Sequence, residues 1–251
     1  MLRIYLSGRI SIEGEALLGP SDFPGPQGQV AFAYLVSSRG GPVSRSTLAD
    51  VLWDGRPPRS WDSALSAIVS RLRSLLNQAG VDGAATLTGA HGAYEMRLPA
   101  GTWIDHEAAV EAIHEAEALI AGGDFKKAYG PSAVARLVAR RPFLPGQDSR
   151  FIEERRQQMD SVLVRALECR SRVYLWNGEF PLAAEAAREL LALRPFWESG
   201  YRLLMRAHTE AGNAAEALRV YEECRQVIAD ELGVGPSPET RALHAEVLKA
   251  V

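Results

Sequence analysis

Two glycine turns lie 34 residues apart in the second half of the chain, at Asn177-Gly178 and Ala211-Gly212. Each turn is followed by an alanine-rich segment, at residues 182–186 and 215–218. Small residues let paired helices approach closely, and each pair must stack on the next pair to bury its apolar face. The spacing therefore predicts an array of stacked helix pairs, which constrains the fold more than any other feature.

A weaker third copy of this turn occurs at Gly122-Gly123-Asp124-Phe125. Ala, Leu, Glu and Arg dominate from Trp103 onward, without a strand pattern. The 34-residue spacing is also the period of tetratricopeptide repeats. We therefore expect residues 102–251 to form an all-α, tetratricopeptide-like repeat domain.

The first hundred residues follow a different pattern. Leu2, Ile4 and Leu6 alternate as in a strand, and Glu13-Gly14-Glu15 is typical of a hairpin turn. Three helical segments follow, and the third places six apolar residues on one stripe: Leu65, Ile68, Val69, Leu72, Leu75 and Leu76. A hairpin with glycines at its turn, residues 86–98, ends the region. Sheet, three helices and hairpin is the order of an α+β winged helix-turn-helix.

The length of 251 residues favours two domains, and Pro99-Ala100-Gly101 is the natural linker. The predicted domains are residues 1–98 and 102–251. No segment has the roughly eighteen consecutive apolar residues of a membrane span, and no signal peptide is evident. We expect a cytoplasmic protein without membrane contact. The two cysteines, Cys169 and Cys224, lie in helical patterns and are expected to be buried, reduced thiols.

The net charge of −3 conceals a small asymmetry. Residues 1–100 contain nine Arg, no Lys and eight acidic residues, a net charge of +1 (9 − 8). A nucleic-acid surface needs local positive charge, so this balance permits DNA binding by a local patch without by itself arguing for it.

Several segments resemble those of the actinomycete antibiotic-regulatory activators, called SARP proteins. In the first half these are residues 48–53 ahead of Pro57-Pro58, and residues 69–73. In the second half they are residues 215–218, Tyr221, 230–234 and 236–239. Such chains join an OmpR-like winged helix to a bacterial transcriptional activator domain (BTAD). The resemblance implies a transcriptional activator that recognises direct-repeat promoter sites as a homodimer on double-stranded DNA and recruits RNA polymerase.

The third helix and the loop before it carry the candidate DNA contacts. Four guanidinium groups could reach phosphates: Arg56, Arg59, Arg71 and Arg73. The helix face opposite the apolar stripe offers hydroxyls for base contacts: Ser63, Ser66, Ser70 and Ser74. Serine reads bases ambiguously, so this surface is thin. The wing tip carries His91, and Asp62 either repels phosphates or only favours the helix dipole.

An alternative function is a protein-interaction scaffold whose winged helix no longer binds DNA. The second half of the chain has several exposed-looking arginines. They fit a solvated surface with salt bridges and a partner-binding surface equally well: Arg140-Arg141, Arg155-Arg156, Arg170 and Arg172. Glu111-Ala112-Ile113-His114 has the spacing of a di-iron ligand pair, but a second such pair is missing from the sequence. We expect no enzymatic activity, no cofactor and no metal.

Overall fold

The computed structural model describes residues 1–249, which form two compact units. Residues 1–108 and 138–160 make up the first unit, and residues 109–137 with those from 161 onward make up the second. The division therefore falls inside helices of the second half of the chain. The predicted domain bounds, residues 1–98 and 102–251, divide the chain by function, and this division stays a prediction.

A four-stranded sheet opens the first unit, in the order β3-β2-β1-β7. β1 (Arg3–Tyr5) pairs antiparallel with β2 (Ser11–Glu13), and β2 pairs antiparallel with β3 (Leu17–Leu18). This confirms the predicted N-terminal antiparallel sheet. β7 (Trp103–Ile104) pairs in parallel with the other edge of β1, where only helices were expected. The expectation was wrong because a two-residue strand is too short to show a period of two.

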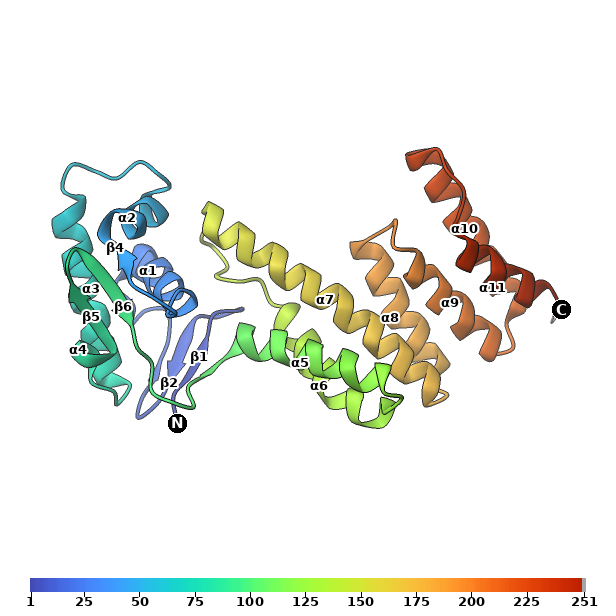
Figure 1. The fold of residues 1–251 in the computed structure, drawn as a ribbon, viewed down its shortest axis with the longest axis horizontal. Coiled ribbons are helices and arrows are strands. Elements are labelled where there is room, and N and C mark those ends of the chain that lie inside the picture. Colours follow the sequence, from blue (N-terminus) through green and yellow to red (C-terminus); the bar gives the residue numbers. More distant parts are fainter. Residues whose placement is uncertain (250–251) are drawn as a thin grey trace. The chain divides into compact units, whose positions relative to one another are not determined.

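Three helices and a second sheet complete the winged helix-turn-helix (Figure 1). The helices are α1 (Gly25–Ser37), α2 (Arg45–Trp53) and α3 (Trp61–Gln78), followed by one turn, α4 (Gly83–Thr86). The sheet has the order β4-β6-β5, with β4 (Val43–Ser44), β5 (Leu87–Ala90) and β6 (Ala93–Met96). All six residues of the predicted apolar stripe of α3 are buried, which confirms the orientation of this helix.

Asp105 joins the start of α5 (Asp105–Ala121) to the end of β1. The residue is 2% exposed, and its carboxylate accepts backbone N–H groups from Leu6 at 3.0 Å, from Ser7 at 2.8 Å and from His106 at 2.7 Å. A buried carboxylate is tolerated where hydrogen bonds replace its lost hydration, and the helix N-terminus adds a favourable dipole. Asp105 thereby fixes the chain after β7 against the first sheet.

Residues 138–160 return to the first unit and complete its core. The Leu144 N–H donates to the Leu6 carbonyl at 2.9 Å, and the Gly8 N–H donates to the Pro142 carbonyl at 2.8 Å. Phe143 and Leu144 are buried in the same cluster as the apolar residues of β1, β2 and α3. The winged helix therefore shares one core with residues that lie about forty positions beyond the wing.

Paired antiparallel helices build the second unit, and α5, α6 and α7 of these pairs each have one end in the first unit. The pairs are α5 with α6 (Phe125–Ala139), α7 (Arg150–Trp176) with α8 (Phe180–Leu193), and α9 (Glu198–Glu210) with α10 (Ala214–Leu232), followed by α11 (Pro238–Lys249). The three predicted turns join the two helices of each pair. Gly123, Gly178 and Gly212 have φ values of +80°, +77° and +77°, which is the left-handed conformation that glycine favours. The tetratricopeptide-like repeat is confirmed.

Both cysteines are free and buried, as predicted. Burial raises the pKa of the Cys169 and Cys224 thiols to about 12, because a thiolate is costly in apolar surroundings. Among residues 1–249, no helix is both long and apolar enough to cross a membrane.

Candidate nucleic-acid interface

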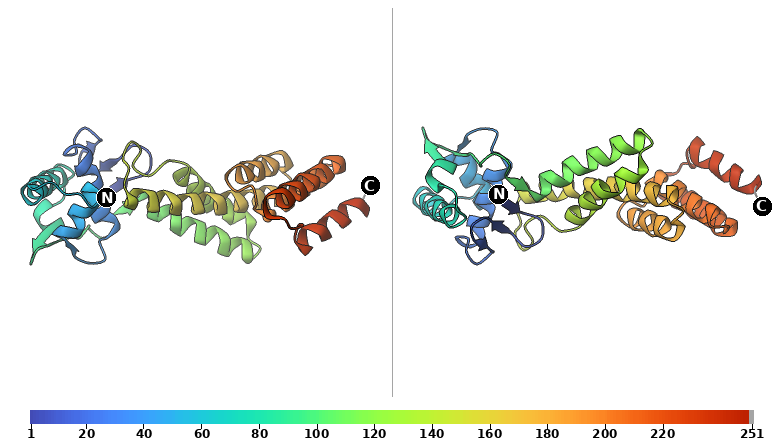
Figure 2. Two further views of the ribbon diagram at one scale, coloured as in Figure 1. Left: turned by 90° about the horizontal axis from the view of Figure 1, so that it is seen from above. Right: turned by 90° about the horizontal axis from the view of Figure 1, so that it is seen from below.

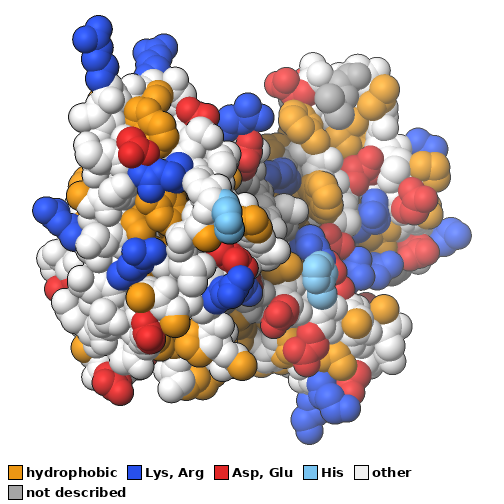
Figure 3. All heavy atoms as spheres, turned by 60° about the vertical axis from the view of Figure 1, so that its left-hand side comes forward, with side chains coloured by type: hydrophobic (Ala, Val, Ile, Leu, Met, Phe, Trp, Pro, Cys, Tyr) orange, Lys and Arg blue, Asp and Glu red, His pale blue; other side chains and the backbone are white. Residues whose placement is uncertain are grey.

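The candidate interface consists of α3, the loop at residues 54–60 before it, and the β5–β6 hairpin. Both views of Figure 2 show these elements side by side at one end of the first unit. Figure 3 shows arginine side chains (blue) projecting at several places from this unit, separated by uncharged surface. The Ser44 side chain caps α2 by accepting the Thr47 N–H at 3.0 Å, which sets the start of the helix-turn-helix.

Arg45 connects α2, α3 and the hairpin. Its Nη2 donates to Asp62 Oδ1 at 2.7 Å, to the Asp62 carbonyl at 2.9 Å and to Ser66 Oγ at 2.8 Å. Its Nη1 donates to the Tyr94 hydroxyl, and its guanidinium carbon lies 5.2 Å from the centre of the Tyr94 ring. The ion pair places a cation directly beside the Asp62 carboxylate, so the one acidic residue on the candidate helix face is compensated.

The four candidate phosphate contacts fall into two groups. Arg56 and Arg59 lie on the loop and Arg71 lies on α3, and all three side chains are exposed. Arg73 is partly buried, and its Nε donates to the Leu87 carbonyl of β5 at 2.8 Å. Arg73 therefore holds the hairpin against α3, which leaves Arg56, Arg59 and Arg71 as the more accessible cations of the four.

The four candidate base contacts are all exposed on α3, as the wheel of this helix predicts. Three of their hydroxyls donate within the helix: Ser63 to the Ser60 carbonyl, Ser66 to the Asp62 carbonyl, and Ser74 to the Ser70 carbonyl. Such bonds fix the rotamers and leave the oxygens of Ser63 and Ser74 as acceptors, whereas the Ser66 oxygen already accepts from Arg45. The hydroxyl of Ser70 makes no hydrogen bond to another residue among positions 1–249, which makes it the most available donor.

His91 lies at the tip of the hairpin, where the sequence places the wing. Its φ of 51° and the φ of 75° at Gly92 form the tight turn between β5 and β6, and its side chain is exposed. At the base of the wing, Arg97 Nη2 donates to Glu95 Oε2 at 2.7 Å. This hydrogen bond lowers the pKa of Glu95 and raises that of Arg97, so the wing base carries a matched charge pair.

Sequence reasoning missed Arg45 and Tyr94. Arg45 follows the capping residue Ser44, and nothing local links it to Asp62 or to the hairpin, since these partners lie 17 and 49 positions away. The available signal was the combination of an acidic residue on a candidate DNA-facing helix and an arginine at the start of the helix before it.

Residues 104–248 match the family model described as the bacterial transcriptional activator domain. The chain belongs to this family. The resemblance to SARP-type regulators is thereby confirmed. Relatives of this chain are named as transcriptional regulators.

Three relatives illustrate the similarity. The regulatory protein AfsR of Streptomyces coelicolor is 31% identical over 241 residues, which cover 95% of this chain and 23% of AfsR. The transcriptional regulatory protein EmbR of Mycobacterium tuberculosis is 28% identical, with coverages of 89% and 58%. The transcriptional regulator RedD of Streptomyces coelicolor is 27% identical, with coverages of 86% and 62%. This chain spans less than two thirds of the length of each of these three relatives.

A solved structure supports the same fold. Mycobacterium tuberculosis EmbR in complex with a low-affinity phosphopeptide superimposes with a TM-score of 0.88 at 25% sequence identity. The match covers 99% of the activator-domain chain and 65% of the EmbR chain. The order of winged helix and helical repeats is therefore common to both proteins.

Proposed function

We propose that this chain is a transcriptional activator that binds double-stranded DNA through residues 56–97 and recruits RNA polymerase. The observation that carries the proposal is the exposed polar face of α3, flanked by exposed arginines and with Asp62 compensated by Arg45. Arginines beside a helix supply phosphate contacts, which give most of the affinity in such complexes. Membership in a family of transcriptional regulators supports the same function.

We further propose that the chain binds direct-repeat promoter sites as a homodimer, in the way that the family resemblance implies. In this proposal residues 1–98 carry the DNA contacts, and the repeats of residues 102–251 carry the protein contacts. Stacked helix pairs suit that role because their extended surfaces usually bind peptides or proteins.

A mobility-shift assay with genomic fragments tests the proposal. We expect a subset of fragments to bind in the nanomolar range at physiological salt, well above the level of non-specific binding. A protein that shifts no fragment, or all fragments equally, would instead be an interaction scaffold whose winged helix has no role in sequence recognition.

Arg71→Ala should flatten the dependence of DNA affinity on salt. Each neutralised phosphate contributes a slope of about −0.9 in log K against log salt, so loss of one contact changes the slope by about one. Titrations of a bound fragment at several salt concentrations measure this. Arg225→Ala is the matched control, because Arg225 is exposed on α10 in the second unit. Equal changes in both variants would mean that the slope reports only overall charge.

Ser70→Ala should alter the choice among DNA sequences more than the overall affinity. The hydroxyl is exposed, and one neutral hydrogen bond to a base edge corresponds to a change in preference of about threefold. Competition between operator variants with single base changes measures the preference. Ser46→Ala, an exposed hydroxyl on α2, is the control. A uniform loss of affinity on every sequence would contradict base contact by Ser70.

A further inference from the structure

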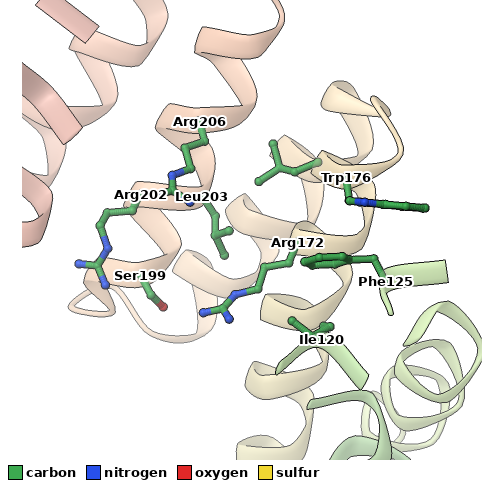
Figure 4. Close-up of a pocket in the computed structure, with 9 residues that line it drawn as sticks. Ile120, Phe125, Arg172, Trp176, Ser199, Arg202, Leu203 and Arg206 are labelled. Carbon is green, nitrogen blue, oxygen red and sulfur yellow. The ribbon is translucent and has the colours of Figure 1, made fainter. Parts of the chain in front are cut away.

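A cavity of about 550 Å³ opens in the second unit between the first helices of the three pairs, α5, α7 and α9. Three arginines line it, Arg172 from α7 and Arg202 and Arg206 from α9, and none of the lining residues is acidic. Figure 4 shows the guanidinium of Arg172 extending toward Ser199 of α9, whereas the side chain of Arg202 extends away from Arg172. Volumes of this order are typical of sites that enclose a ligand or a few side chains of a partner.

The positive charge of this cavity is only partly compensated. Arg172 donates to Glu168 at 2.7 Å, and Arg202 donates to Thr240 at 2.9 Å and lies 4.0 Å from Glu198. Arg206 is exposed, and within residues 1–249 it forms no ion pair. The cavity therefore presents an unneutralised cation beside two others, which favours an anionic occupant.

The remaining wall of the cavity is apolar and aromatic. The rings of Phe125 and Trp176 stack with centroids 5.9 Å apart and an interplanar angle of 14°. Trp176 is 55% exposed although it belongs to a helix of the repeat, and Ile120 lies beside the pair. Exposed aromatic surface of this kind marks binding sites, because it is stabilised when a partner covers it.

We propose that this cavity binds an acidic peptide segment of a partner protein, with an apolar side chain on Phe125 and Trp176 and carboxylates at Arg172 and Arg206. Arg172 on α7 and Arg206 on α9 line the same cavity from neighbouring pairs of the repeat. Alternate side chains of an extended peptide point to one face, so a single acidic segment can present two carboxylates to this cavity. Duplex phosphates would supply the charge but no apolar group for the aromatic wall.

The inference rests on one part of the proposed function, the protein contacts of the repeats, and names the chemistry of the segment that they bind. Its test uses the full chain and a set of fluorescein-labelled synthetic peptides, in which acidic residues at alternate positions flank one Phe, Leu or Trp. Anisotropy titrations should give micromolar dissociation constants for members of the set. The same peptides with Gln and Asn in place of Glu and Asp should bind at least about tenfold more weakly, since they lack charge-assisted hydrogen bonds.

Two double variants make the test specific. Arg172→Gln with Arg206→Gln should weaken peptide binding about tenfold or more. Arg219→Gln with Arg225→Gln should leave it unchanged, because both are exposed, paired arginines of α10 outside the cavity. Trp176→Ala should also weaken binding, with helix content checked by circular dichroism.

Three results would overturn the inference. One is the absence of binding to any acidic peptide at about 1 mM. Another is an equal effect of the two double variants, which would reveal a general charge effect. The third is displacement of the peptide by single-stranded or duplex DNA, which would make the cavity a nucleic-acid site. Loss of DNA binding by the winged helix would leave peptide binding unchanged, so failure of this inference is distinguishable from failure of the proposed DNA binding.

Discussion

Asp105→Ala should lower the free energy of unfolding of the first unit by about 3 kcal/mol or more. The substitution leaves the buried N–H groups of Leu6 and Ser7 without their acceptor. Each unsatisfied buried donor costs about 1–3 kcal/mol, and no compensating apolar contact replaces the carboxylate. The loss should separate α5 from the end of β1 and expose the edge of the first sheet where β7 pairs.

Denaturant titration of the full chain, together with hydrogen exchange at the amides of residues 3–7, measures this loss. Asp50→Ala is the control, because Asp50 is exposed in the same unit and its substitution should change stability by less than about 0.5 kcal/mol. Asp105→Asn keeps one acceptor oxygen and should fall between the two. Wild-type stability and protection in Asp105→Ala would show that the return of the chain does not depend on this carboxylate.

Arg45→Gln should reduce DNA affinity by about 10- to 100-fold. The substitution leaves the Asp62 carboxylate uncompensated on the candidate DNA-facing helix, where it would repel phosphates. It also removes the hydrogen bond to Tyr94 and so loosens the hairpin against α3. Because this one substitution has both effects, the loss of DNA affinity should exceed that of Arg71→Ala, which removes only one phosphate contact.

A double-mutant cycle separates these effects. Asp62→Asn alone should bind DNA at least as well as the wild type, since a negative charge is removed. Combined with Arg45→Gln, it should recover most of the affinity lost by repulsion and none of the loss that comes from the hairpin. Strictly additive changes would show that Arg45 contacts DNA without acting through Asp62.

The sequence predicted those parts of the fold that follow a regular period. The stripe of α3 repeats over three turns, and the glycine turns at 178 and 212 repeat at a fixed spacing, so each signal is averaged over many residues. β7 has two residues and β4 has two, which is below the length at which alternation can be recognised.

The return of residues 138–160 to the first unit could not be predicted because its contacts are long-range. Arg156 illustrates the difficulty, since as part of an arginine-rich segment it fitted a solvated or partner-binding surface. In the structure its guanidinium donates to the carbonyls of Phe143, Leu144 and Gln147 and supports the returning segment. Arg170 also fitted a solvated or partner-binding surface. In the structure it is only 9% exposed, and its guanidinium lies over the rings of Tyr129 and Tyr174.

The sequence predicted where the candidate site lies, but it did not predict which of the charged side chains there are paired. The exposed face of α3 and the loop arginines follow directly from the helical period. The roles of Arg73 at the hairpin and of Arg45 at Asp62 depend on which loops come together in space, and residue type alone does not encode this.

The shared core of the first unit has a consequence for the order of events during synthesis. The winged helix is synthesised before the repeats, yet four residues of its core, Phe143, Leu144, Phe151 and Ile152, are translated only after the first helix pair, α5 and α6. Domains fold as units when their last core residues become available. Nascent or prematurely terminated chains that end before these residues should therefore lack a stable winged helix, so that only ribosomes well into the repeats would release a chain with this unit folded.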